Sequence, residues 1–178
     1  MRLISGDALE PEWGPLIEAF AAMITLSSEY VVLQVYTRHD NQCGPYVQTL
    51  QEEEGALHLE AASNLFLDPP IGPDAINSLR AMGWIDPYPE DGIPNHHIFL
   101  EPDDVSPGTV ARFLVKTLRD CYLVTPRDSF EFAPPELLLQ LVNGDFGESL
   151  DLSFESFDLE AWKRDYLLRP FSPDGDDA

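Results

Sequence analysis

The chain has 178 residues, 44% of them hydrophobic, which is enough for one globular domain with its own core. Its 32 acidic residues against 10 lysines and arginines give a net charge of −22 at pH 7. Such a charge repels nucleic acid phosphates and anionic membrane surfaces, so it argues against a nucleic-acid-binding protein and leaves two interpretations, solubility alone or a basic partner.

Neither a membrane span nor a signal peptide is expected. No segment approaches the roughly 18 uninterrupted apolar residues of a membrane-spanning helix, and the first residues lack the apolar core of a signal peptide. Cys43 and Cys121 show no metal-ligand spacing, so we expect two free thiols in a reducing compartment. These features predict a cytoplasmic protein.

The first predicted element is a helix over residues 11–26. Its large apolar residues recur with the 3.6-residue period of an amphipathic helix: Trp13, Leu16, Ile17, Phe20 and Ile24. Pro11 fits the first turn, where backbone N–H groups have no helical partner. We therefore expect one face of this helix to lie against the core.

Three strands are predicted next, over residues 30–38, 45–51 and 56–63. The first is almost wholly apolar, which is typical of a central strand covered on both faces. The third alternates, with leucines and an alanine on one face and His58 and Glu60 on the other. Because the link between the last two ends in Gly55, which suits a positive φ, we expect these two strands to form a hairpin.

Two further helices and one more strand complete the predicted domain. A short helix over residues 73–82 should end at Gly83, the residue after its C-cap. A fourth strand is expected over residues 96–101, and Ser106 marks the start of the last helix. The order α-β-β-β-α-β-α predicts an α+β fold, in which helices pack on an antiparallel sheet.

The composition changes after Val124, and we place a boundary there. Residues 1–124 would form the α+β domain, and residues 125–178 an acidic C-terminal extension with 13 acidic and 4 basic residues. The extension still holds large apolar residues at strand and then at helical spacing: Leu150, Leu152, Phe154, Leu159, Trp162 and Tyr166. Since disordered segments have low hydrophobicity, we expect it to dock on the domain, either completing the core or competing with a partner.

The adjacent histidines His96 and His97 are the first candidates for a metal or catalytic site. In a strand they point to opposite faces and cannot converge on one metal ion, and nothing in the sequence ties His39 or His58 to them. The chain has no nucleophile motif, phosphate loop or dinucleotide fingerprint. We therefore predict no bound metal, no cofactor, no catalytic residue and no enzymatic activity; a hydrolase that uses the acids and histidines is the weakest alternative.

Two residues near the turns have structural interpretations. Trp84 follows the helix end at Gly83 and precedes a proline-rich turn, where it either plugs the end of the core or contacts a partner. Asn64 is expected to close a turn by bonding its own backbone.

Four short motifs carry a resemblance to a known family. They are PYVQ at 45–48, LHLEAASN at 57–64, L..MGW..P from Leu79 to Pro87, and Asn95. Together they resemble the actinobacterial domains related to YbjN and to type III secretion chaperones, over roughly residues 10–124 and not the extension. The resemblance implies an α-β-β-β-α-β-β-α fold and a chaperone-like domain that binds peptides or proteins. The additional strand would lie within residues 84–95 or be absent.

From the resemblance we expect a non-enzymatic cytoplasmic module that binds a protein or peptide segment. The alternative is an acidic regulator that mimics the charge of a polyanion and blocks a basic protein. The resemblance also implies a homodimer, in keeping with the exposed edges of a small open sheet. The candidate partner-binding residues come from the motif segments and from the extension: Tyr46, Gln48, Trp84, Leu150, Phe154 and Trp162.

Overall fold

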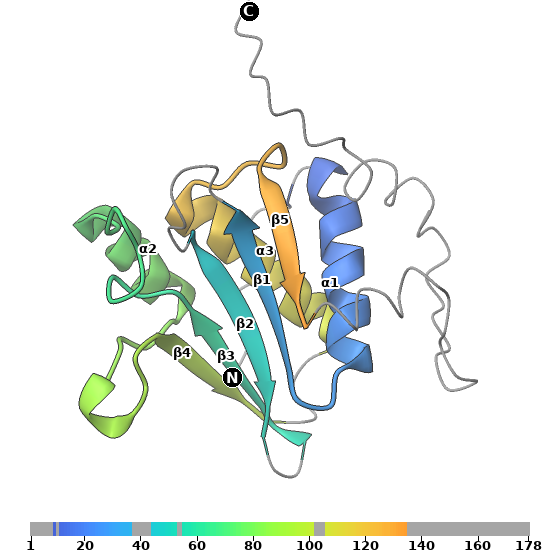
Figure 1. Cartoon of the computed structure of the whole chain (residues 1–178), viewed down its shortest axis with the longest axis horizontal. Helices are drawn as coiled ribbons and strands as arrows, with labels where there is room; N and C mark the ends of the chain where they lie inside the picture. The colour runs from blue at the N-terminus through green and yellow to red at the C-terminus, as the bar shows by residue number, and fades with distance from the viewer. Residues whose placement is uncertain (1–8, 10, 37–43, 53–54, 102–105, 135–178) are drawn as a thin grey trace, which may run out of the picture.

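The protein folds as a five-stranded antiparallel sheet with three helices packed on one face (Figure 1). The computed structural model of the chain describes residues 9, 11–36, 44–52, 55–101 and 106–134. Its strands are β1 (Tyr30–Tyr36), β2 (Tyr46–Gln51), β3 (Leu57–Ala61), β4 (His96–Leu100) and β5 (Ser129–Ala133). Its helices are α1 (Gly14–Leu26), α2 (Pro73–Met82) and α3 (Pro107–Tyr122), with short 3-10 turns at Pro11–Trp13 and Pro89–Asp91. The predicted α+β fold class is confirmed.

The strand order across the sheet is β4-β3-β2-β1-β5, and every neighbouring pair is antiparallel. After α3 the chain returns to place β5 beside β1, where Leu33 pairs with Phe132. The sequence does not predict this strand, because it is only five residues long and just two of them, Phe130 and Phe132, are large and apolar. The sheet therefore continues past the boundary proposed at residue 124.

The predicted extension falls largely outside the described residues. This holds for the whole of residues 135–178, including the expected strand, the expected helix and their docking on the domain. The observed element order is α-β-β-β-α-β-α-β, so the fifth strand follows α3 and does not precede it. Between α2 and α3 the described residues contain, besides β4, only two isolated bridges, Ile85 with His97 and Tyr88 with Ile93. In place of the expected second strand, the described residues of this region show one bridge to the outer edge of β4, that of Ile85 with His97.

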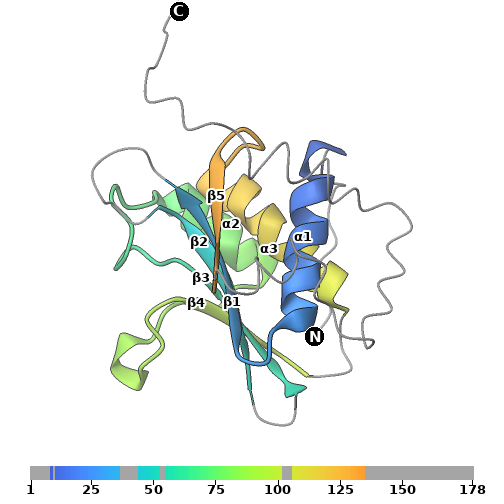
Figure 2. The same cartoon turned by 45° about the vertical axis from the view of Figure 1, so that its right-hand side comes forward.

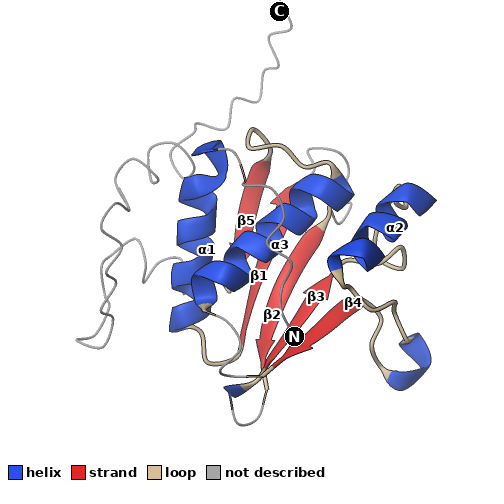
Figure 3. Ribbon diagram, turned by 180° about the vertical axis from the view of Figure 1, so that it is seen from behind, coloured by secondary structure: helices blue, strands red, loops and turns tan. Residues whose placement is uncertain are grey.

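All three helices lie on the same side of the sheet (Figures 2 and 3). α3 crosses the middle of the sheet, α1 lies beside it toward β1 and β5, and α2 lies beside it toward β3 and β4. α1 is buried around more of its surface than an amphipathic helix, because Ala19, Ala21 and Ala22 are buried together with its large residues. Phe20 of α1 contacts Phe132 of β5 with 5.8 Å between ring centroids, and Trp13 of the preceding 3-10 turn lies edge-on to Phe130 at 6.2 Å.

The local signals for helix ends and turns are confirmed. Gly83 follows α2 with a φ of 100°, and Gly55 in the β2–β3 link has a φ of 83°, both in the left-handed region that glycine adopts readily. The Ser106 side chain accepts a hydrogen bond from the Thr109 backbone N–H at 3.3 Å and so caps α3. These signals are local, so the sequence alone was enough to place them.

Residues 83–95 form the crossover from α2 to β4, which explains the unusual composition there. Trp84 anchors it: the side chain is 3% exposed and its ring stacks on Phe113 of α3 at 5.4 Å. Ile85 then exchanges two backbone hydrogen bonds with His97. Arg80 of α2 donates to both carboxylate oxygens of Asp86. The crossover is therefore tied to the helix layer and to the sheet edge.

Asn64 closes a larger loop than expected. Its side chain accepts from the Ile71 backbone N–H at 2.8 Å and donates to the Ile71 carbonyl at 3.1 Å. It thus pairs with the residue seven positions later and does not bond its own local backbone.

None of the helices in the described part of the chain has the length and apolar character needed to cross a bilayer.

Candidate functional site

The side of the sheet opposite the helices faces the viewer in Figure 1, and no described helix covers it. We call it the open face. Alternate residues of each strand point to it, because side chains alternate between the two faces of a sheet. The cross-strand register places the following residues there: Tyr30, Val32 and Gln34 of β1, Tyr46, Gln48 and Leu50 of β2, His58 and Glu60 of β3, His97 and Phe99 of β4, and Glu131 of β5.

A hydrogen-bond network is centred on the Glu60 carboxylate, which lies in a residue only 7% exposed. Its Oε2 accepts from the amides of Gln48 at 2.6 Å and Asn95 at 2.7 Å. Asn95 is held in turn, since its Oδ1 accepts from the Tyr46 hydroxyl at 3.0 Å and from the Ser63 backbone N–H at 3.3 Å. The network joins β2, β3 and the crossover, and it fixes the carboxylate in one position.

Two histidines flank this carboxylate. The Nε2 of His58 lies 3.6 Å from Glu60 Oε1, and the His58 ring is 5.9 Å from the ring of His97. His97 is directly opposite Glu60 in the β3–β4 register. Burial lowers the pKa of His58 from its ordinary value, and the nearby charge of Glu60 opposes this effect. The ring nitrogens His58 Nε2 and His97 Nδ1 are buried and have no hydrogen-bond partner within the described ranges.

Aromatic side chains surround the polar network on its accessible sides. Phe99 is 51% exposed and stacks on His58 with 4.2 Å between ring centroids. Tyr88 of the crossover lies 6.1 Å from His97 and is also exposed, as is Tyr30 on β1. Phe66, 6.4 Å from Tyr46, extends the set at the end of β2. The open face thus combines a fixed polar centre with exposed apolar rings.

The charged side chains of the described strands and of the crossover are all acidic. The five strands and the crossover contain acidic residues but no lysine or arginine. The described basic residues lie on α2, on α3 and in the turn before β5: Arg80, Arg112, Lys116, Arg119 and Arg127. The electrostatics of the open face therefore favour a cationic group over an anionic one.

The structure brings together two of the six predicted site residues. Tyr46 and Gln48 both lie on the open face and both belong to the Glu60 network. Trp84 lies on the opposite side of the sheet, where burial makes it a core residue with no surface for a partner. Leu150, Phe154 and Trp162 lie outside the described residues.

Sequence reasoning missed the centre of the site. The prediction that His96 and His97 point to opposite faces is confirmed: His97 faces Glu60, whereas His96 is paired with Ala61 and lies 3.9 Å from Asp86. The statement that nothing ties His58 to this pair is wrong, because His58 and His97 are ring neighbours. The sequence does indicate that His58 and Glu60 share one face of β3. It does not indicate which residues of β2 and β4 lie beside them, because this depends on the strand register.

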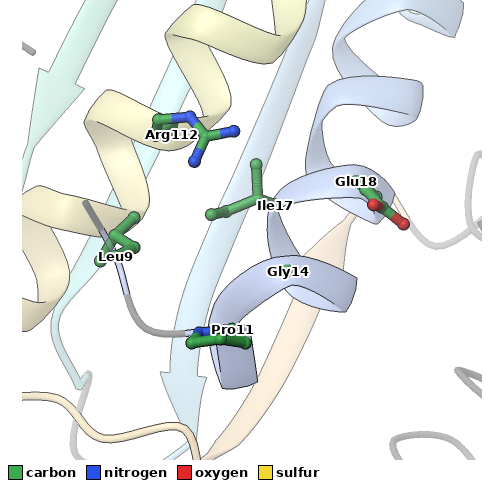
Figure 4. A pocket seen from close by; sticks show the side chains of 6 residues that line it. All are labelled: Leu9, Pro11, Gly14, Ile17, Glu18 and Arg112. Atoms are coloured by element: carbon green, nitrogen blue, oxygen red, sulfur yellow. The ribbon is translucent and has the colours of Figure 1, made fainter. Parts of the chain in front are cut away.

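A small pocket lies between α1 and α3, on the helix side of the sheet (Figure 4). It has a volume of about 130 Å³ and is lined by Leu9, Pro11, Gly14, Ile17, Glu18 and Arg112. Arg112 extends from α3 toward α1, whereas Glu18, whose pKa is raised by burial, points away from it. Ligand pockets usually measure about 300–1,000 Å³, so this pocket could hold a single side chain.

Metal binding has no support among the residues that the structure describes. They contain no group of three or more histidine, cysteine, aspartate or glutamate side chains placed to hold a metal ion. Cys121 is buried in α3, and Cys43 lies outside the described ranges.

Comparison with known proteins identifies one family. The family model described as "T3SS (YopN, CesT) and YbjN peptide-binding chaperone 3", TY-Chap3, matches residues 6–131. The match covers more than half of the chain and reaches into β5. Neither the curated proteins nor the solved structures contain a significant match.

Proposed function

This chain belongs to the TY-Chap3 family of peptide-binding chaperone domains, and we propose that its open face holds an extended segment of a partner protein. The observation that carries this proposal is a sheet face without a described helix, on which exposed aromatic rings surround a fixed polar network. Sheet faces that are not covered by helices commonly carry polar residues, and exposed aromatic groups beside them mark interaction sites. The expected partner is therefore a polypeptide with apolar residues.

The outer edge of β4 gives such a segment backbone groups to bind. Ile85 bonds the outward-facing N–H and C=O of His97. Because hydrogen-bonding direction alternates along an antiparallel strand, the N–H and C=O of Phe99 point to the same outer side. Within the described residues, no bridge pairs with Phe99 on this outer side of β4. An added strand could pair there and place its side chains over the open face, as in β-strand addition.

The finer parts of the proposal concern chemistry and location. We infer a non-enzymatic module that acts in the cytoplasm on a basic partner segment. The buried free thiol of Cys121 supports the location, and the described strands, which contain acidic residues but no lysine or arginine, support the basic partner. We also propose that the extension docks on the domain, and that two chains associate as a homodimer through an exposed sheet edge.

An acidic regulator that mimics a polyanion is the second candidate function. The net charge of −22 favours it, together with strands that carry no basic residue. Salt separates the two functions, because at about 0.5 M the Debye length falls to roughly 4–5 Å and long-range attraction is screened. Binding through aromatic contacts should persist at that salt concentration, whereas binding by charge mimicry should be lost.

A peptide array tests the proposed function. Fifteen-residue peptides of varied composition would be probed with the full chain and with a Phe99→Ser variant, at low and at high salt. The matched control is Leu123→Asn, because Leu123 is 81% exposed, lies at the end of α3 and has a φ of 57° that asparagine tolerates. We expect Phe99→Ser to lose most bound peptides and Leu123→Asn to keep them. Equal binding by all three proteins would contradict the proposal.

A further inference from the structure

We propose that Glu60 and His58 form a subsite for the ammonium group of a lysine side chain in the bound segment. This inference rests on the proposed function and specifies the chemistry that the open face recognises. It starts from an asymmetry in the Glu60 carboxylate. Oε2 accepts two amide hydrogen bonds, from Gln48 and Asn95, whereas Oε1 accepts none from the described residues.

His58 supplies a second acceptor beside Oε1. Its Nε2 lies 3.6 Å from that oxygen, which is too long for a hydrogen bond. The nitrogen is buried, its residue is 7% exposed, and the described part of the chain offers it no hydrogen-bond partner. Buried polar atoms without partners are rare and costly, so each calls for an explanation. If the His58 proton is on Nδ1, the nitrogen on the Glu52 side of the ring, then Oε1 and Nε2 are neighbouring acceptors with no donor among the described residues.

A lysine ammonium supplies what this arrangement lacks. It is a compact cation with three donors, so it can donate to Oε1 and to Nε2 together. Guanidinium groups bind carboxylates best through both oxygens. Because Oε2 is already occupied by two amides, arginine would have to displace one of them. The subsite therefore favours lysine over arginine.

The surroundings also suit the lysine stem. Lysine buries its methylene chain along apolar surface while its charged end reaches a polar group. Phe99 covers one side of the His58 ring, and Leu50 lies opposite His58 in the β2–β3 register. No basic residue of the strands or of the crossover competes for Glu60. A lysine of a strand added at the outer edge of β4 would thus pass over the Phe99 ring before its ammonium group reaches Oε1.

Three small probes test the subsite on the wild-type full chain: n-butylammonium, n-butylguanidinium and n-butanol. The readout is the NMR shifts of the His58 and His97 imidazole signals at about pH 7.5, where an ordinary histidine is neutral. We expect saturable shifts with butylammonium, binding of butylguanidinium weaker by about threefold or more, and no shift with butanol. Equal shifts from all three probes, or no saturable shift with butylammonium, would overturn the proposal.

Charge-removing variants locate the effect. Glu60→Gln should weaken butylammonium binding about tenfold or more, as expected when a charged acceptor is lost. Glu131→Gln is the control, because Glu131 is an exposed carboxylate on the open face of β5. If Glu60→Gln does not fold, the three-probe comparison still decides. Two results together would refute this subsite: the protein binds array peptides with no preference for lysine, and n-butylammonium gives no saturable NMR shift. The proposed function would still stand, because peptides would still bind.

Discussion

Trp84 of the crossover donates its indole N–H to the hydroxyl of Thr117 in α3, at 3.1 Å and inside the core. The Thr117 hydroxyl in turn donates to the Phe113 carbonyl at 3.0 Å, and the Trp84 ring stacks on the Phe113 side chain. A single side chain thus fixes the distance between the crossover and α3. This matters for the open face, since the crossover also carries Asn95 and Tyr88.

Replacement of Trp84 should therefore destabilise the whole domain. We expect Trp84→Ala to lower the free energy of unfolding by about 3–5 kcal/mol, the range for truncation of a large buried aromatic residue. Trp84→Phe should cost less, because it keeps the ring stacking and loses only the indole hydrogen bond. Urea unfolding of both variants measures these differences. An unchanged midpoint for Trp84→Ala would contradict the anchoring role.

Acidification should destabilise the domain through its buried histidines. Burial lowers the pKa of His58 and of His96 below the ordinary value of 6.5. Below that value the unfolded chain therefore binds protons that the folded chain does not. The stability that the two neutral histidines contribute is complete above about pH 6.5. It is lost as the pH falls toward the pKa values of these histidines in the folded protein.

The test compares slopes of stability against pH. Acidification also reduces repulsion among the many carboxylates, so the informative quantity is the difference between wild type and a His58→Asn, His96→Asn double variant. His97, Glu52, Glu60, Asp86 and Arg80 surround the two histidines and are unchanged in both proteins. We expect the wild type to lose more stability than the double variant between about pH 7 and pH 5. Parallel curves would rule out the buried neutral histidines as the cause.

The thiol of Cys121 should be unreactive in the folded protein. Burial raises its pKa to about 12, and the thiolate is the reactive form. In a Cys43→Ser variant, which leaves Cys121 as the single cysteine, a thiol reagent should label the protein only after denaturant is added. Rapid labelling without denaturant would show that α3 opens at this position.

The proposed homodimer gives a direct prediction of mass. Light scattering at physiological salt should yield about twice the 20.0 kDa of one chain. The charge of −22 on each chain opposes association most strongly at low salt, so the dimer fraction should rise as salt is added. A mass of one chain throughout the salt series would remove the dimer.

Most of the fold could be predicted from the sequence because its signals are local. Gly55, Gly83 and Ser106 each act within a few residues of the chain, and the structure places all of them as expected. β5 could not be found in this way. Its place beside β1 depends on a pairing between residues about 100 positions apart, which a short segment does not encode.

The candidate site was predictable only in part for the same reason. Tyr46 and Gln48 stood out within a motif, but the network they form needs Glu60 of β3 and Asn95 of the crossover. The Gln48–Glu60 contact follows from the β2–β3 register. A shift of one residue in this register would send Glu60 to the helix side.

The open face as the peptide-binding surface is the central claim, and NMR mapping tests it most directly. The isotopically labelled full chain would be titrated with a peptide that binds the array. Amide signals of β2, β3 and β4 near Gln48, Glu60 and Phe99 should shift most, with smaller changes on the outer surface of α1 and α3. Shifts concentrated on α1 and α3, around the pocket of Ile17 and Arg112, with the β3 and β4 signals unmoved, would contradict the account.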